Sequence, residues 1–502
     1  MKLFEPVRIN SMRLENRIVL PAMVTRLSGE DGHINDDIRD RYLRFARGEP
    51  GLIVIEAMAV HTAKSGPLLR LGEDEFVAEH RDLAARIHDT SPSRVVPQII
   101  HFLKIARSGW RQKVEDLSRE EIAGVVLAYG RAAGRARAAG YDGVELHMAH
   151  AYTQSSFLSR RNGRRDEYGG SLENRMRLMS ETIERVRREV GADFPIGVRF
   201  DGEECITDGY GLLDAEQFAL RMARLGVDYL SISAGGKFED AIHKPGEPLY
   251  PYTGYSGDRC MPPAGYQDGY NSYLAAGIRA HLRAHGYDTP ICATGKIGTP
   301  LLAQQTLDDG KADLIGMARA MLCDPDLPRK WRSGREHTVI RCTYGNVCKA
   351  LDENFRKVRC VYWPRGALQA PRSDDVEAPT WAEGPRLAAL HAHGRVELSW
   401  SPAIDNEGVY GYEIFRAEGA GALSHLTSVH GHKRSWTDLT AVGGTRYRYA
   451  VAAYDFAGNR SAQTEEAAVD VPLGAGVAAP GPSRHPDEAE ECNAKVTVRE
   501  GG

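Results

Sequence analysis

The chain has 502 residues, of which 42% are hydrophobic and 26% are charged, a composition that excludes a wholly disordered or fibrous protein. Its 64 basic and 68 acidic residues give a net charge of −4, so nothing draws the chain as a whole to nucleic acid or to an acidic membrane surface. No apolar run reaches the roughly 18 residues that a membrane-spanning helix needs.

The N-terminal sequence MKLFEPVRIN lacks the apolar segment of a signal peptide, and eight cysteines are spread over the whole chain. A chain of this length buries enough core to fold without disulfides. Both features predict a reduced, cytoplasmic setting, in which clustered cysteines are first considered as metal ligands.

Residues 1–335 alternate short β-branched segments with amphipathic helical ones, such as Arg119–Ala139 and Leu172–Val190. Ser118 followed by Glu121 is a capping box for the first of these helices. Eight βα units with nearly continuous apolar strands predict a parallel TIM barrel, an α/β fold. The alternative is an open doubly wound sheet, which should have a glycine-rich turn after its first strand, and no such turn follows here. The predicted strands are Ile18–Ala22, Leu52–Glu56, Val95–Ile99, Gly143–Leu146, Ile196–Phe200, Tyr229–Ser233, Ile291–Thr294 and Leu314–Met317.

The sequence changes character after Pro364. Residues 366–385 are rich in Pro, Ala, Asp and Arg and predict a linker. Over residues 386–473 the apolar residues recur with period two, as in Val396, Leu398 and Trp400, and turn sequences separate these segments. This pattern predicts a small all-β sandwich, followed by a disordered, low-complexity tail over residues 474–502.

A polar cluster follows the fourth predicted strand, at the end of a barrel where active sites form. It contains His147 and His150, three residues apart, and then Tyr152. Such a group can hold a carbonyl oxygen between two donors and offer a phenol as a proton source. A metal site is an alternative, but two histidines without a suitably spaced carboxylate are too few ligands. Two hydrogen-bonded loop histidines without a functional role are the third interpretation.

This cluster opens a longer motif, HMAHAYTQSSFLSRRNGRRDEYGGSLENR, which resembles the central signature of the old yellow enzyme family of FMN-dependent oxidoreductases. Further segments resemble the family in the same order: NRIVLPAM, GLIVIEAMAV, PQIIH, VRF, TGKI and LIGMARAMLCDPDLPRKW. The resemblance covers about residues 1–365 and implies a TIM barrel with FMN at the carboxyl ends of its strands.

The resemblance also implies roles for individual residues. His147 and His150 would hold a substrate carbonyl or the nicotinamide amide, and Tyr152 would donate the proton. Arg199 would stabilise the reduced flavin, and the alternative is that it pairs with a barrel carboxylate. The remaining predicted flavin contacts are Pro21, Ala22, Met23 and Ala57 beside the ring, Gln98 at the pyrimidine edge, and Gly295, Lys296, Ala318 and Arg319 around the phosphate.

Four positions depart from the family pattern. Val24 replaces a Thr or Cys that contacts the flavin, Ala151 replaces a Gly, and Arg160 replaces a Pro. Lys296 replaces a small residue, and its charge would either add to the phosphate site or point to solvent.

The segment 336–365 contains Cys342, Cys348 and Cys360 and resembles the iron–sulfur segment of a family subgroup that includes 2,4-dienoyl-CoA reductase and trimethylamine dehydrogenase. Four thiolates normally hold a [4Fe–4S] cluster, and Gly345 occupies the second ligand position here. A cluster would therefore need a water, Cys323 or another group as its fourth ligand. The alternative is a degenerate loop with buried, reduced thiols.

Long members of that subgroup continue into a nucleotide-binding module, whereas this chain continues into a sandwich that resembles a fibronectin type III domain. WSPAIDNEGVYGYEIFR and TRYRYAVAAYDFAGNRS carry the resemblance, including the corner residue Tyr447. NAD(P)H would then reduce FMN directly, and the sandwich would serve for docking to a protein partner or for homo-oligomerisation.

The loop after the sixth predicted strand, residues 237–276, holds six tyrosines that would either cover a flat substrate or pack against one another. They are Tyr250, Tyr252, Tyr255, Tyr266, Tyr270 and Tyr273. Where dienoyl-CoA reductases carry a Trp-His pair, this chain has Lys237-Phe238, which argues against a dienoyl-CoA substrate.

The sequence as a whole predicts an FMN-dependent, NAD(P)H-driven reductase of an activated C=C bond, acting on an enone or a related conjugated small molecule. One alternative is an iron–sulfur flavoprotein dehydrogenase, demethylase or dienoyl-CoA reductase. The other is a flavin-bound scaffold that acts through the fibronectin domain.

Overall fold

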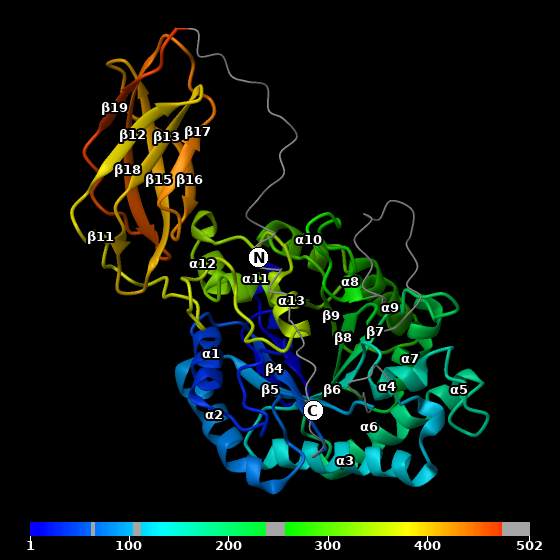
Figure 1. The fold of residues 1–502 in the computed structure, drawn as a ribbon. Coiled ribbons are helices and arrows are strands. Elements are labelled where there is room, and N and C mark those ends of the chain that lie inside the picture. The colour runs from blue at the N-terminus through cyan, green and yellow to red at the C-terminus, as the bar shows by residue number, and fades with distance from the viewer. Residues whose placement is uncertain (62–65, 104–111, 237–256, 474–502) are drawn as a thin grey trace, which may run out of the picture. The chain divides into compact units, whose positions relative to one another are not determined.

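The computed structural model describes residues 1–61, 66–103, 112–236 and 257–473 (Figure 1). The chain divides into two compact units, Met1–Ala370 and Pro371–Gly502. Among the described residues, no helix is both long and apolar enough to cross a bilayer.

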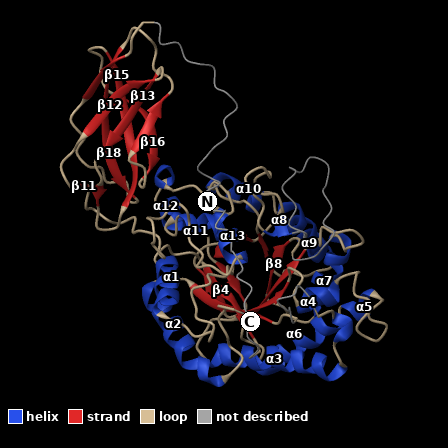
Figure 2. Cartoon of the chain, viewed as in Figure 1, coloured by secondary structure: helices blue, strands red, loops and turns tan. Residues whose placement is uncertain are grey.

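The first unit is a closed barrel of eight parallel strands surrounded by helices, as the TIM-barrel prediction requires (Figure 2). All eight predicted strands are present, and their ends differ from the prediction by at most three residues. Around the barrel the order is β10, β3, β4, β5, β6, β7, β8 and β9. Their bounds are β3 Ile18–Leu20, β4 Leu52–Ala59, β5 Arg94–Ile100, β6 Val144–Met148, β7 Ile196–Asp201, β8 Tyr229–Ser233, β9 Ile291–Ala293 and β10 Leu314–Gly316.

A short antiparallel hairpin precedes the barrel and was not predicted. Its strands, β1 (Val7–Ile9) and β2 (Met12–Leu14), bury Ile9, Met12 and Leu14 against the amino-terminal parts of the barrel strands. The hairpin therefore closes the end of the barrel opposite to the carboxyl ends of the strands.

The helices cover the outside of the barrel. They are α1 Asp36–Ala46, α2 Val77–Thr90, α3 Arg119–Ala138, α4 Thr153–Leu158, α5 Leu172–Arg175, α6 Arg177–Val190, α7 Leu212–Arg224, α8 Gly257–Cys260, α9 Ser272–Ala284, α10 Pro300–Asp308, α11 Ala318–Cys323, α12 Leu327–Arg332 and α13 Val347–Glu353. Four single turns of 3-10 helix lie at Lys2–Phe4, Asp74–Phe76, Val114–Asp116 and Glu336–Thr338.

The predicted capping box begins α3. Ser118 Oγ accepts the amide of Glu121 at 3.1 Å, and Glu121 Oε2 accepts the amide of Ser118 at 2.8 Å. The amphipathic helical segment predicted over Leu172–Val190 is present, with one interruption at Met176 (φ −78°, ψ −8°), which separates α5 from α6. In the short α5, the Asn174 side chain donates to the carbonyl of Gly169 at 3.1 Å and so holds the first turn against the preceding loop.

The segment that follows the barrel folds with the first unit up to Ala370, beyond the predicted start of the linker at residue 366. Two buried arginines of α1 hold its end: Arg41 Nε donates to the carbonyl of Leu368 and Arg44 Nε to that of Ala370, both at 3.1 Å. The second half of the predicted linker contains a strand of the second unit, β11 (Thr380–Trp381), which pairs with β14 (Ala403–Ile404).

The second unit is the predicted all-β sandwich. One sheet has the order β12 (Leu387–Ala392), β13 (Arg395–Trp400) and β17 (Ser435–Asp438). The other has the order β16 (Ser424–His430), β15 (Val409–Glu418), β18 (Arg446–Asp455) and β19 (Ala467–Asp470). Along β13 the buried residues Val396, Leu398 and Trp400 alternate with exposed ones, as the period-two pattern predicts. The hydroxyl of Tyr447 accepts the amide of Val442 at 3.0 Å, the geometry of a tyrosine corner.

Some predictions fall outside the described residues: Tyr250, Tyr252, Tyr255, the Lys237-Phe238 pair and the tail from 474. The other three loop tyrosines are described, and they contact their own surroundings. Tyr266 is 3% exposed and packs edge-on against Tyr270 at 4.8 Å, while the Tyr273 hydroxyl donates to Glu203 at 2.8 Å.

Candidate active site

A cavity of about 990 Å³ lies at the carboxyl ends of the barrel strands, within the size range of sites for small molecules and cofactors. It brings together the residues predicted for catalysis and for flavin contact, although they come from seven different strand ends and loops. The lining includes Pro21, Ala22, Met23, Ala57, Gln98, His147, His150, Tyr152, Arg199, Gly295, Lys296, Ala318 and Arg319.

The two histidines form a chain of hydrogen bonds whose direction follows from the backbone. The amide of Ala149 donates to His147 Nδ1 at 3.2 Å, so His147 carries its proton on Nε2. His147 Nε2 lies 3.2 Å from His150 Nδ1, which must therefore accept. Burial, with Arg199 nearby, lowers the pKa of His147 from 6.5 to about 3, so this imidazole is neutral at physiological pH.

His150 continues this chain of hydrogen bonds toward Ser233 at the end of β8. Its Nε2 lies 2.7 Å from Ser233 Oγ, the acceptor that its tautomer requires. The backbone amide of His150 donates to Asp201 Oδ2 at 2.7 Å, and this bond fixes a residue whose φ of 64° lies in the left-handed region. The sulfur of Cys260 lies 3.1 Å from the same Nε2 and accepts a hydrogen bond from Ser233.

Tyr152 stands at the start of α4 beside the pair. Its ring meets that of His147 edge-on, with centroids 5.1 Å apart, and it lines the cavity. Its phenol and the two imidazoles therefore face one space, as the sequence cluster predicts.

Arg199 is a buried cation that bonds only to neutral groups. It is 7% exposed, and its guanidinium donates to Ser231 Oγ at 3.0 Å and to Ser233 Oγ at 3.3 Å. Among the described residues, no carboxylate lies within 4.0 Å of it, which argues against the interpretation that it pairs with a barrel carboxylate. A buried guanidinium of this kind is suited to an anionic or electron-rich ligand in the cavity.

Gln98 and Glu145 form the polar floor beside Arg199. Gln98 Nε2 donates to Glu145 Oε1 at 2.6 Å, and the hydroxyl of Tyr229 donates to Glu145 Oε2 at 3.0 Å. Tyr229 reaches this position because residue 197 is glycine, where a Cβ would lie 2.0 Å from the tyrosine ring. The Nε2 amino group of Gln98 is thus held by Glu145, which leaves Gln98 Oε1 to accept a hydrogen bond from a ligand.

The opposite end of the cavity is cationic. Arg319 is 7% exposed and donates to the carbonyl of Pro262 at 2.8 Å and to Asn346 Oδ1 at 2.6 Å. Lys296 is equally buried, which contradicts the expectation that it points to solvent; its Nζ donates to the carbonyl of Ala264 at 2.8 Å and pairs with Asp268 at 3.2 Å. Both cations lie over the ring of Tyr344, at 4.8 Å and 5.2 Å from its centroid.

Comparison with known proteins connects this geometry to a family. The sequence model of the NADH:flavin oxidoreductase / NADH oxidase family matches residues 2–112, 104–247 and 272–338. The chain belongs to this family. The NADH oxidase of Thermoanaerobacter brockii is 30% identical over 401 residues, which cover 75% of this chain and 58% of that protein. The NADPH dehydrogenase of Bacillus licheniformis is 33% identical over 346 residues, covering 65% of this chain and 93% of that protein.

The fold comparison agrees with the sequence comparison. The solved structure of an old yellow enzyme homologue from Zymomonas mobilis superposes with a TM-score of 0.55 at 21% identity, covering 74% of this chain and 100% of that one. This likeness shows a shared fold. The chain spans little more than half of the T. brockii relative, 58% of its length.

The residues present fit the flavin mononucleotide that the family description implies. The cavity offers Arg199 without a counter-charge, Gln98 with an acceptor oxygen, and Arg319 with only neutral hydrogen-bond partners at the other end. Gly295 adopts φ +109°, a conformation that side chains rarely allow, where backbone amides can approach a phosphate closely. A flat polar ring with a phosphate at its far end matches this distribution of groups.

Three of the family departures are explained in part. Ala151 adopts φ 63°, a left-handed conformation that explains why glycine is usual there. Val24 lines the cavity and can form no hydrogen bond with a flavin. Arg160 is held away from the cavity, with its Nε 2.7 Å from Asp214.

The cysteine segment lies next to the cavity, but only Cys348 lines it. Burial raises the pKa of Cys348 to about 11 and raises that of Cys342, so both remain thiols at neutral pH. Cys323, on α11, donates a hydrogen bond to Cys360, which lowers the pKa of Cys360. Three thiols of the motif and Cys323 are thus neighbours, and Gly345 supplies no ligand. Among the described residues, however, no three of these sulfur atoms lie within 4.8 Å of one another.

Several residues of the site were not predicted. Ser231 and Ser233 face Arg199 and His150 from β8, and Asp201 fixes the backbone of His150. Cys260 joins them from a distant loop. The serines carry a sequence signal, because two hydroxyl residues spaced by two at the carboxyl end of a barrel strand point to the same face.

Proposed function

We propose that this protein is an FMN-dependent oxidoreductase of the ene-reductase type, with NAD(P)H as its hydride donor. The observation that supports the proposal most strongly is a neutral His147–His150 pair and the phenol of Tyr152 facing one cavity, beside the unpaired Arg199. An activated C=C bond conjugated to a carbonyl, as in an enone, suits these groups. Overall, the alkene gains a hydride and a proton while NAD(P)H becomes NAD(P)⁺.

When bound, FMN supplies the chemistry that no side chain offers, accepting a hydride from NAD(P)H and passing it to the β carbon of the alkene. Arg199 and Gln98 would hold the polar edge of its ring, and Arg319, Lys296 and Gly295 its phosphate. Pro21, Ala22, Met23 and Ala57 would pack beside the ring as part of the apolar lining.

The histidine pair polarises the substrate carbonyl. Because both imidazoles are neutral and His147 directs its only N–H at His150, a carbonyl oxygen that binds here must accept the hydrogen bond that His147 now donates to His150. Ser233, with Arg199 behind it, keeps the tautomer of His150 fixed during this exchange. The binding of a carbonyl therefore breaks one histidine–histidine hydrogen bond and makes at least one to the ligand.

Tyr152 then donates a proton to the α carbon. Tyr152 is the N-cap residue of α4 and is partly exposed, so its phenol can regain a proton from solvent. Flavin reduction by NAD(P)H consumes no such proton, so the two half-reactions depend on this residue differently.

The test is stopped-flow measurement of the two half-reactions, with cyclohexenone as the alkene. Tyr152→Phe should leave flavin reduction within a few-fold and slow alkene reduction by about 10²–10⁴. Tyr273→Phe is the matched control, because its hydroxyl bonds to Glu203 away from the cavity lining. His147→Ala and His150→Ala should weaken the binding of carbonyl ligands to the oxidised protein, seen as a smaller shift of flavin absorption.

Two results would contradict the proposal. Equal slowing of both half-reactions in Tyr152→Phe would exclude the tyrosine as proton donor, and so would normal alkene reduction. A dehydrogenase would be favoured if neither NADH nor NADPH reduced the flavin, while another substrate was oxidised with an artificial electron acceptor.

We also propose that the second unit is a fibronectin type III module that acts in docking or oligomerisation rather than in the chemistry. Its three- and four-stranded sheets and the Tyr447 corner support this. All seven described cysteines are free, which favours a reducing compartment such as the cytoplasm.

A further inference from the structure

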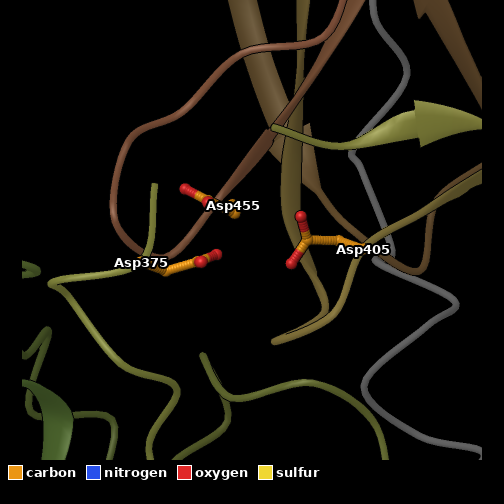
Figure 3. Close-up of side chains that lie close together, drawn as sticks. All are labelled: Asp375, Asp405 and Asp455. Carbon is orange, nitrogen blue, oxygen red and sulfur yellow. The ribbon is translucent and has the colours of Figure 1, made fainter. Parts of the chain in front are cut away.

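Three aspartates of the sandwich converge at one end of its strands (Figure 3). Asp375 precedes β11, Asp405 directly follows β14, and Asp455 is the last residue of β18. One carboxylate oxygen of each lies within 4.8 Å of the others. The three residues lie up to 80 positions apart in the sequence, so the fold alone brings them together.

Two of these carboxylates have a buried oxygen without a hydrogen-bond partner. The Oδ2 atoms of Asp375 and Asp405 are shielded from solvent and accept no hydrogen bond. The Asp455 side chain is 1% exposed. A buried carboxylate oxygen with neither water nor a donor costs a substantial part of its hydration free energy, so a partner is expected.

No side chain supplies that partner. Among the described residues, none of the three aspartates forms a salt bridge, and the nearby Arg372 directs its guanidinium at Asp374, 3.0 Å away. Burial raises the pKa of Asp405 and Asp455, and the mutual repulsion of Asp375 and Asp405 adds to the increase for Asp405. Without a cation, hydrogen bonds from Asn406 and from Asp455 lower the pKa of Asp375, so a proton shared with Asp455 relieves part of the repulsion among the three carboxylates. A cation between them would relieve the repulsion of all three at once.

The remaining oxygens are held in place by N–H groups. Asp405 Oδ1 accepts the amides of Glu407 and Gly408, both at 2.9 Å. Asp455 Oδ1 accepts the amide of Asn459 at 2.8 Å, and Asp375 Oδ1 accepts from Asn406 Nδ2 at 3.1 Å. Asp455 Oδ2 also accepts, from Asn459 Nδ2 at 2.7 Å, so the Oδ2 atoms of Asp375 and Asp405 are the buried oxygens of the cluster that lack a partner among the described residues.

We propose that Asp375, Asp405 and Asp455 bind one calcium ion. The donor atoms are all carboxylate oxygens, which suit a hard cation rather than zinc or copper. Calcium takes six to eight oxygen ligands in irregular geometry, whereas magnesium requires a near-ideal octahedron and keeps most of its waters. Three carboxylates from three separate segments, with water and carbonyl oxygens completing the shell, match calcium better.

The ion would fasten residues 371–379, which open the second unit, to the ends of β14 and β18. It would thereby stabilise the sandwich without touching the barrel. This inference does not depend on the proposed reaction, because all three ligands lie within the second unit.

The test uses the full chain after removal of metals with a chelator. Isothermal titration with calcium chloride should show one site per chain, and Asp405→Asn or Asp375→Asn should weaken it about tenfold or more. Asp374→Asn is the matched control, since this neighbouring aspartate is outside the cluster and pairs with Arg372. Hydrogen exchange followed by mass spectrometry should show calcium-dependent protection in peptides around residues 375, 405 and 455.

A stability measurement separates a metal site from a structural cluster. In chelator, Asp405→Asn should unfold at the same temperature as the unmodified chain or higher, because it removes one of three repelling charges while Oδ1 can still accept its two amides. With excess calcium it should unfold at a lower temperature than the unmodified chain. No heat of calcium binding, undiminished binding in both variants, a preference for magnesium, or equal destabilisation of Asp405→Asn in both conditions would each overturn the proposal.

Discussion

Arg199 in the barrel and the three aspartates of the sandwich are charges of opposite sign, and neither group forms a salt bridge with another described residue. Arg199 contacts two serine hydroxyls. The aspartates contact amide groups and one another. Buried ion pairs also occur in the barrel: Lys330 pairs with Asp324 at 2.7 Å, with side chains 3% and 0% exposed.

The difference between matched and unmatched charges indicates where ligands belong. A buried ion without a partner is strongly unfavourable, so a fold that keeps one is suited to a molecule that completes it. The barrel would be completed by an electron-rich ring with a phosphate, and the sandwich by a metal cation. The predictions below test the barrel side of this comparison and its independence from the sandwich.

The largest effect is expected for Arg199→Ala. Removal of a charge-assisted hydrogen bond of about 2 kcal/mol should weaken FMN binding by about 30-fold or lower the flavin reduction potential. Fluorescence titration of the flavin-free protein and a redox titration would measure both. Arg199→Lys keeps the charge and should therefore lose less FMN affinity than Arg199→Ala. Unchanged FMN affinity and reduction potential in Arg199→Ala would exclude contact between Arg199 and the flavin.

The cationic end of the cavity holds one charge with an acidic partner and one without, so the two can be compared in the same site. Arg319 has only neutral hydrogen-bond partners, whereas Lys296 already pairs with Asp268. Arg319→Met should therefore weaken FMN binding by about tenfold, and Lys296→Met by only a few-fold, measured by the same titration. Equal losses of FMN affinity in the two variants would mean that the ion pair with Asp268 does not reduce the contribution of Lys296 to phosphate binding.

In the cysteine segment burial raises the pKa of Cys342 and Cys348, and Gly345 supplies no fourth ligand. We expect less than about one iron per chain after anaerobic reconstitution, and a gain in Gly345→Cys toward about four. The change is sterically permitted, because a Cβ at Gly345 meets nothing within 4 Å. Iron analysis and visible absorption would measure it, and about four irons in the unmodified protein would instead require Cys323 or a ligand other than cysteine at the fourth position.

The pH dependence of carbonyl binding should be small. The pKa of His147 is lowered from 6.5 to about 3, so the folded protein keeps a neutral imidazole throughout pH 5.5–8 and the dissociation constant of a carbonyl ligand should change less than about twofold. In the unfolded chain the same group binds a proton below pH 6.5, so acid lowers stability from pH 6.5 down toward 3. A tenfold change in ligand binding centred near pH 6.5 would show that one of the histidines titrates in the folded protein.

Truncation should separate the two regions with no effect on the barrel. A chain ending at Ala370 should keep its FMN affinity and lose calcium binding, because Arg41 and Arg44 retain the carbonyls of Leu368 and Ala370. A chain ending at Pro364 lacks those carbonyls and should be less stable on heating. Loss of FMN from the longer truncated chain would show that the sandwich supports the active site.

The barrel and its site were predictable from the sequence where local patterns are strong. The strands are apolar on both faces, which is typical of parallel barrels, and β4 is buried along its whole length. The His147–Tyr152 cluster lies within six residues at one strand end, so its convergence needed no tertiary information. The break at Met176 and the hairpin over residues 7–14 depend on tertiary packing, and periodicity does not report them.

The connections between distant segments could not be predicted. The direction of the histidine hydrogen bonds depends on the backbone amide of Ala149, and Cys260 reaches His150 from 110 residues away. Asp375, Asp405 and Asp455 follow no metal-binding motif, and they converge only because two strand ends and the segment before β11 meet. The burial of Lys296 likewise depends on carbonyls of residues about 30 positions earlier.

The hairpin of β1 and β2 has a kinetic consequence. It fills the amino-terminal end of the barrel with Ile9, Met12 and Leu14, and the described residues that line the cavity lie at the carboxyl ends of the strands and in the loops that follow them. A hydride donor and an alkene would then have to occupy the same space one after the other. Turnover should accordingly follow a substituted-enzyme pattern, with parallel lines in double-reciprocal plots, and each substrate at high concentration should inhibit the reaction of the other.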